Sequence, residues 1–188
     1  MHGGGMSALH GSATFRRFFI GGKPEKGFHG KAVKSINGRR FSPTTDSETV
    51  SFGWVPMTDP LADNVTQEDT FVGDLVCRGF RQDEKVVRSA DVKDELKQRG
   101  REIQFERGKP LTRQERTALK EAIIAELRAR APVRRRVAEL VWHPERAELR
   151  MFGASKAMAA TAAELFQKTF SLEMEEVSVE TLMGRLGW

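Results

Sequence analysis

The sequence predicts an α+β protein with two small antiparallel half-sheets, each packed by one helix, and a helical hairpin inserted between them. Three observations lead to this architecture. Runs typical of strands occur near both ends of the chain, a helical pattern occupies its middle, and that middle carries the excess of positive charge. The 188 residues, 39% hydrophobic and 30% charged, suit one sizeable domain with a strongly polar surface.

In the first half of the chain, the residue pattern predicts a strand, a helix and two further strands. Residues 14–20 form a β-type run that ends at Gly21-Gly22, and Pro24 then suits the first turn of a helix. Apolar side chains recur at helical spacing until Asn37-Gly38, which indicates a stop. Residues 50–56 and 70–81 are the next two strand candidates.

The middle of the chain reads as two helices joined by a tight turn. Residues 89–107 follow a helical pattern that Gly108-Lys109-Pro110 breaks, and Thr112 and Glu115 have the spacing of a capping box. At ~1.5 Å per residue, arms of roughly 17 residues would extend about 25 Å. Each arm has only a narrow apolar stripe, so we expect an antiparallel hairpin that protrudes.

The last third returns to mixed structure. Residues 136–143 and 147–152 are a strand pair, Ser155 caps a helix, residues 173–179 form a final strand, and a short tail runs to Trp188. We therefore expect a disordered leader at 1–12, an α+β body from 13–84 and 136–188, and a basic hairpin at 85–135.

Positive charge is concentrated in one segment. Residues 85–136 hold 16 Lys or Arg and 8 Asp or Glu, whereas the rest of the chain holds 15 and 18. This asymmetry predicts an element that binds a polyanion on an otherwise nearly neutral body. A solvated pair of helices with ordinary Lys and Arg decoration stays open as the alternative.

The predicted binding residues lie along the hairpin and at its end. Five arginines occupy nine positions from Arg128 to Arg136 with no carboxylate among them, and guanidinium groups match phosphate oxygens bidentately. Phe105 is the one aromatic residue between 85 and 136, so a stacking platform for single strands is not indicated and phosphate contact on a duplex fits better. The candidate DNA-binding residues are Lys93, Lys97, Arg101, Lys109, Arg113, Arg116, Lys120, Arg128, Arg130, Arg134, Arg135 and Arg136.

No catalytic, metal-binding or cofactor-binding residues are predicted. The acids of one loop lack the spacing that aims two carboxylates at one ion, so we interpret them as solvated: Asp59, Asp63, Glu68, Asp69 and Asp74. The single cysteine, Cys77, has apolar neighbours and suits a reducing cytoplasm. No run approaches the ~20 apolar residues of a membrane span, and residues 1–6 do not resemble a secretory signal.

Several blocks together resemble the bacterial recombination-associated protein RdgC family. The blocks are Phe52-Gly-Trp-Val-Pro56, Asp83-Glu-Lys-Val-Val-Arg88 leading into Val92-Lys-Asp-Glu-Leu96, Arg107-Gly-Lys-Pro-Leu-Thr-Arg-Gln-Glu115 with Leu119-Lys120-Glu121 and Leu127, and Trp142 followed by Ala154-Ser155. Their order and spacing carry the resemblance, which covers about residues 14 to 180.

The resemblance implies sequence-independent binding of double-stranded DNA by a ring-like homodimer that restrains recombinase action. Family members carry Leu-Leu-Pro-Arg-Ala-Phe at the end of the hairpin, where the Arg and the Phe help to close the ring. The matching stretch here is Leu127-Arg-Ala-Arg-Ala-Pro132, which keeps Arg130 and has Pro132 in place of the aromatic. Familiar members are also longer, with a C-terminal region that helps to form the ring, so a closed ring is not assumed for this chain.

The sequence thus predicts a non-enzymatic, cytoplasmic, nucleoid-associated protein that binds double-stranded DNA and modulates recombination by occupying it. An apolar tail with Leu182, Met183, Leu186 and Trp188 favours a homodimer or a larger homo-oligomer. The alternative is an interaction protein whose basic hairpin binds an acidic protein or structured RNA.

Overall fold

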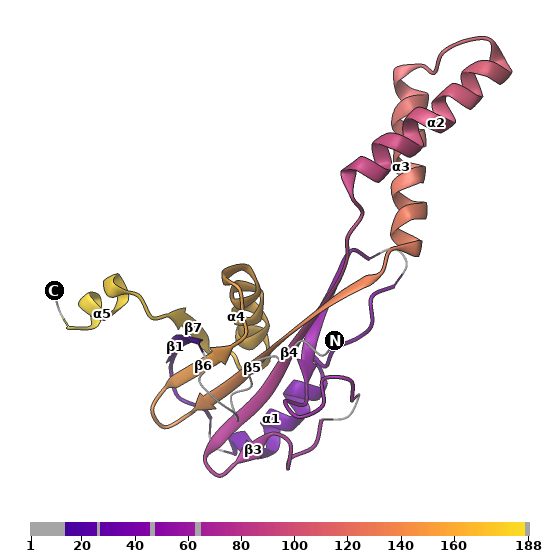
Figure 1. The fold of residues 1–188 in the computed structure, drawn as a ribbon. Helices are drawn as coiled ribbons and strands as arrows, with labels where there is room; N and C mark the ends of the chain where they lie inside the picture. Colours follow the sequence, from indigo (N-terminus) through magenta and orange to yellow (C-terminus); the bar gives the residue numbers. More distant parts are fainter. Residues whose placement is uncertain (1–13, 26, 46–47, 63–64, 187–188) are drawn as a thin grey trace. The chain divides into compact units, whose positions relative to one another are not determined.

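A computed structural model describes residues 14–25, 27–45, 48–62 and 65–186 (Figure 1). The predicted leader at 1–12 lies outside these residues. The elements in chain order are β1 (Phe15–Gly21), α1 (Phe28–Asn37), β2 (Val50–Val55), β3 (Phe71–Val72), β4 (Leu75–Lys85), α2 (Ser89–Arg107), α3 (Arg113–Arg130), β5 (Val133–His143), β6 (Glu148–Phe152), α4 (Lys156–Phe170), β7 (Glu173–Glu176) and α5 (Val179–Leu186).

The seven strands form one sheet in the order β2-β4-β5-β6-β1-β7, with β3 paired to β4. Pairing is antiparallel for β1 with β6 and β7, for β3 with β4, and for β5 with β6. The predicted α+β class is confirmed, but the two expected half-sheets are continuous. β4 pairs with β5, and β1 from the first half of the chain pairs with β6 and β7 from the last third. Without the pairing of β4 with β5, one edge of each of these long strands would lack hydrogen-bond partners.

Two local predictions need correction. Residues 70–81 were expected to form one strand, yet they contain β3, a turn at Gly73 with φ of 60°, and the first part of β4. The turn is easily adopted by glycine, which has no Cβ to clash at positive φ. The tail after the last strand contains a helix, α5, whose turns begin at Val179.

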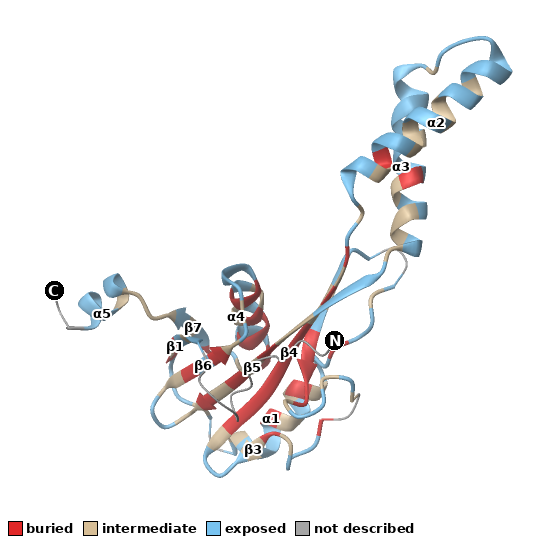
Figure 2. Cartoon of the chain, viewed as in Figure 1, coloured by how far each residue is buried: buried red, intermediate tan, exposed pale blue. Residues whose placement is uncertain are grey.

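The chain divides into two compact units, a sheet unit and a hairpin unit. Of the described residues, the sheet unit comprises those up to Ser42, those within Phe52–Gln82 and those from Arg136 onward, and the hairpin unit comprises those within Pro43–Ser51 and Asp83–Arg135. Buried residues concentrate on the strands and on α4, whereas α2 and α3 are mostly exposed (Figure 2).

Aromatic side chains fill the centre of the sheet unit. Trp142 of β5 is 1% exposed, and its ring centroid lies 5.2 Å from Phe28, 5.1 Å from Phe166 and 5.3 Å from Phe170. Phe28 belongs to α1 and the other two phenylalanines to α4, so both helices bury their apolar faces against the same tryptophan.

The block Phe52-Gly-Trp-Val-Pro56 has a steric reason for its glycine. Phe41 donates its backbone N–H to the carbonyl of Trp54 at 2.9 Å, which brings the preceding segment close to β2. A Cβ on Gly53 would lie 2.4 Å from the Cα of Phe41. Only a residue without a side chain allows this approach.

Candidate nucleic-acid interface

The two helices of the hairpin unit are shaped by local sequence signals. Gly108 ends α2 in the left-handed conformation at φ of 66°, as expected for the C-terminal cap of a helix. The predicted capping box opens α3: Glu115 donates its N–H to the hydroxyl of Thr112 at 3.3 Å, and its carboxylate accepts from the Thr112 N–H at 2.9 Å.

Ion pairs hold one side of α2 against α3. The Arg99 guanidinium donates to both carboxylate oxygens of Glu126, at 3.1 and 2.8 Å, and also to Glu95 at 2.9 Å. Arg107 pairs with Glu115 at 2.9 Å. Residues 99 and 107 thus meet 126 and 115, so the helices run antiparallel.

These ion pairs make the stability of the hairpin depend on pH. The Arg99 guanidinium holds the pKa of Glu126 below its ordinary value of 4.5. A carboxyl whose pKa is lowered by folding stabilises the fold above its unfolded pKa, and this contribution is lost as the pH falls through the lowered pKa. Amide hydrogen exchange of α2 and α3 should therefore show Glu126→Gln to be less protected than the unchanged protein near pH 6, with the difference shrinking below about pH 4.

A control for this prediction lies on the same helix. Glu121 is exposed, and among the described residues it forms no salt bridge, so Glu121→Gln should leave the exchange unchanged at every pH. A Glu126→Gln difference that stays constant with pH would show that the carboxylate does not act through its charge.

A cationic depression lies between the two helices. Its volume is about 400 Å³, and its cationic lining residues are Lys93, Lys97, Arg101 and Arg116. The remaining lining residues are neutral, so no carboxylate lines this depression. On α2 the three cations are four residues apart, which places them on neighbouring turns of one helix face.

A second depression of about 480 Å³ continues the first, since Lys93 lines both. Lys120 and Arg128 line it from α3, Lys85 lines it from the end of β4, and Glu84 is its one carboxylate. Val86, Val87, Val92 and Ile124 make its floor more apolar. On α3, residues 116, 120, 124 and 128 are spaced by four and share one face.

We call the two depressions together the hairpin groove. Its six predicted cations are called the groove cations: Lys93, Lys97, Arg101, Arg116, Lys120 and Arg128. Within the described part of the chain none of the six forms a salt bridge, in contrast to Arg99 and Arg107 on the same hairpin. The Nε of Arg128 is buried and has no hydrogen-bond partner among the described residues. The groove therefore presents an excess of positive charge, with Glu84 as the one carboxylate in its lining.

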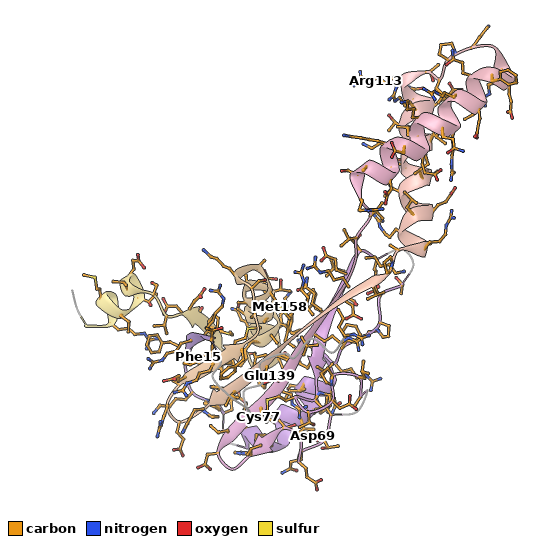
Figure 3. The ribbon with its side chains drawn as sticks, viewed as in Figure 1. Phe15, Asp69, Cys77, Arg113, Glu139 and Met158 are labelled. Carbon is orange, nitrogen blue, oxygen red and sulfur yellow. The ribbon has the colours of Figure 1, made fainter. Side chains whose placement is uncertain are left out.

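The other six predicted residues lie outside this groove. Lys109 and Arg113 are exposed at the turn and at the start of α3, where Figure 3 labels Arg113. Arg134 is exposed at the start of β5, and Arg136 is partly buried.

At least three arginines of the dense run at 128–136 have partners within the fold, namely Arg130, Arg135 and Arg136. Arg130 pairs with Glu126 at 3.4 Å, and Arg135 pairs at 3.4 Å with Asp83, whose side chain is 4% exposed. The absence of a carboxylate within the run therefore did not mean that all its arginines lack partners. Glu126 lies four residues before Arg130 on α3, a spacing that local helical periodicity could have shown. Asp83 lies 52 residues from Arg135 in the chain, so the local sequence does not reveal that pair.

Sequence reasoning missed Lys85 and Gln104 as groove residues. Lys85 lies at the end of β4 and is 6% exposed, and no local pattern marked it as part of a binding surface. Gln104 follows Arg101 by three residues, so helical periodicity alone could have placed it on the cationic face.

The acids of the loop before β4 take part in local contacts. Asp59 accepts the N–H of Leu61 at 3.0 Å, and Asp69 accepts the Thr66 hydroxyl at 2.6 Å. Asp63 lies outside the described residues. Across the described part of the chain, no group of three or more His, Cys, Asp or Glu side chains could hold a metal ion.

Two side chains of β4 beside this loop are buried. Arg78 donates to the carbonyl of Thr66 at 3.2 Å and to the hydroxyl of Thr70, and burial lowers its pKa to about 10. Cys77 is 5% exposed, and burial raises the pKa of its thiol, which leaves it protonated at neutral pH.

The chain matches a known protein family. The family model described as "Putative exonuclease, RdgC" matches residues 30–184. The chain belongs to the RdgC family. The match includes both the sheet unit and the hairpin unit of this RdgC-family chain, so the resemblance seen in the sequence blocks is confirmed. Membership points to a recombination-related, DNA-binding role.

Among the described helices, none is both long enough and apolar enough to cross a membrane.

Proposed function

We propose that this RdgC-family chain binds double-stranded DNA without sequence preference and modulates recombination by occupying the duplex. The groove cations contact the phosphates, and the exposed cations Lys109, Arg113 and Arg134 extend the contact surface. The observation that carries the proposal is a groove lined by six cations that have no salt-bridge partners among the described residues.

The size of the groove suits a polyanion rather than a small ligand. Arg116 and Arg128 are twelve residues apart on α3, which corresponds to about 18 Å along a helix. A duplex presents one phosphate charge per ~1.7 Å of its axis, so such a row faces several phosphates at once. Each contact releases condensed counterions, which supports binding to any duplex.

The side chains of the groove support indifference to sequence. Lysine ammonium groups and arginine guanidinium groups on flexible stems contact phosphates readily, and phosphate contacts carry no direct sequence information. Gln104 is the one amide side chain among the groove residues, whereas base-specific readout uses several fixed side chains at base edges.

We propose a binding role for the chain rather than an exonuclease activity. The acids nearest to a nuclease-like set, Asp59 and Asp69, accept hydrogen bonds within their own loop.

We further propose a homodimer or a larger homo-oligomer that resides in the cytoplasm on the nucleoid. The exposed apolar side chains of α5 support self-association: Val179 is 70% exposed, Leu182 40% and Met183 46%.

Competition between duplexes tests the proposed function. Unrelated duplexes of equal length should compete for the protein with Kd values that agree within about a few-fold. A preference of about 100-fold for one sequence would contradict indifferent binding. A structured RNA of equal charge serves as a further competitor, and much tighter binding of that RNA would favour the alternative that the hairpin binds structured RNA.

A further inference from the structure

Phe105 is exposed to a degree that its own fold does not explain. Its side chain is 91% exposed, whereas the next most exposed phenylalanines, Phe15 and Phe52, are 47% and 40% exposed. It lies in the last turn of α2, three residues before the cap Gly108. Among the described residues, no aromatic or cationic side chain contacts its ring closely enough to count as a ring interaction.

The position of Phe105 continues a row of groove cations. Lys93, Lys97, Arg101 and Phe105 are each four residues apart on α2, and the first three line the hairpin groove. Side chains four apart on a helix are neighbours, with Cβ atoms about 5–6 Å from each other. An aromatic ring therefore lies one turn beyond a cation that we propose to contact a phosphate.

We propose that Phe105 stacks on a base of the bound DNA where the duplex is locally unstacked. This inference rests on the proposed function, and it adds a preference for distorted DNA. Phosphates held by Arg101 lie at the edge of the duplex, and the bases lie directly inside that edge. A phenylalanine ring that enters there removes its apolar surface from water and meets the face of a base, as apolar wedges of other DNA-binding proteins do.

The net charge of the hairpin segment favours DNA over a second copy of the hairpin as the molecule that contacts Phe105. The segment 85–136 carries 16 basic and 8 acidic residues, so two hairpin faces would repel each other when their rings meet. The same charge attracts a nucleic acid. The ring is solitary on the hairpin, so it suits a single opened step rather than a continuous single strand.

The test compares an intact duplex with a duplex of the same sequence that carries one extra, unpaired base. Opening a base step costs free energy, and the cost is smallest where the base is unpaired. The unchanged protein should bind the bulged duplex about tenfold more tightly, as expected for one stacked base. Phe105→Ala should bind the two DNAs equally and keep the salt dependence of the intact duplex. A 2-aminopurine at the bulge should change fluorescence with the unchanged protein only.

Further variants make the result specific. Phe105→Trp should keep the preference because it keeps a ring, and Phe105→Leu should lose most of it. Leu61→Ala removes an apolar side chain that is 62% exposed elsewhere, and it should keep the preference. The stacking role is overturned if Phe105→Ala keeps the preference for the bulge, weakens both DNAs equally, or lowers the mass of the DNA-free protein, which would indicate contact with a second copy. Binding to neither DNA by the unchanged protein would overturn the proposed function together with the stacking role.

Discussion

Replacing Lys97, Arg101 and Lys120 together by glutamine is expected to weaken duplex binding about 100- to 1,000-fold at about 0.1 M salt. Each of the three cations lines the hairpin groove, and each lacks a salt-bridge partner among the described residues. A lost phosphate contact removes about 0.9 counterion from the binding equilibrium, and the three losses multiply. Fluorescence anisotropy of a labelled duplex measures the change.

A matched control removes the same charge from the sheet unit. Lys34, Lys156 and Lys168 are exposed lysines associated with α1 and α4, and among the described residues they form no salt bridge. Their triple replacement by glutamine lowers the net charge equally and should weaken binding by less than about tenfold. Equal losses in the two triple variants would mean that net charge, rather than the hairpin groove, governs affinity.

Replacing Trp142 by alanine is expected to lower the free energy of unfolding by about 3–5 kcal/mol. Trp142 is 1% exposed and contacts aromatic rings of both α1 and α4, so its removal leaves a large cavity between the sheet and two helices. Urea denaturation measures the loss. A loss below about 1 kcal/mol would show that the aromatic group is not the centre of the core.

The same Trp→Phe substitution at the two buried tryptophans, Trp54 and Trp142, measures the contribution of one hydrogen bond. Trp54 donates its Nε1–H to the Thr169 hydroxyl at 2.8 Å, whereas the Trp142 Nε1 is buried and has no hydrogen-bond partner among the described residues. Trp54→Phe should therefore cost about 1 kcal/mol more than Trp142→Phe, because only the first change removes a hydrogen bond.

Local chemistry made much of the fold predictable. The capping box of Thr112 and Glu115, and the glycine that ends α2, are signals within a few residues, and both occur where the sequence indicates them. The pairing of β4 with β5 is not local, since about 50 residues separate the two strands. The sequence therefore suggested two half-sheets where the structure has one sheet.

In the candidate site, too, contacts between separate elements could not be predicted from the sequence. Charge counting identified the hairpin as the basic segment, and Lys93, Lys97 and Arg101 were among its candidate DNA-binding residues. The sequence pattern did not show that Arg99, which lies between Lys97 and Arg101, pairs with Glu126 on α3. Which cations are free to meet a ligand depends on such pairings between elements, and these appear only when the helices are placed side by side.

The salt dependence of duplex binding shows whether the cations of the hairpin groove contact DNA phosphates. With six groove cations on phosphates, a plot of log K against log salt concentration should have a slope of about −5 for the unchanged protein. The slope should flatten to about −3 when Lys97, Arg101 and Lys120 are replaced by glutamine. Equal slopes for the two proteins, or no duplex binding by the unchanged protein at about 50 mM salt, would contradict the assignment of the hairpin groove as the DNA-binding surface.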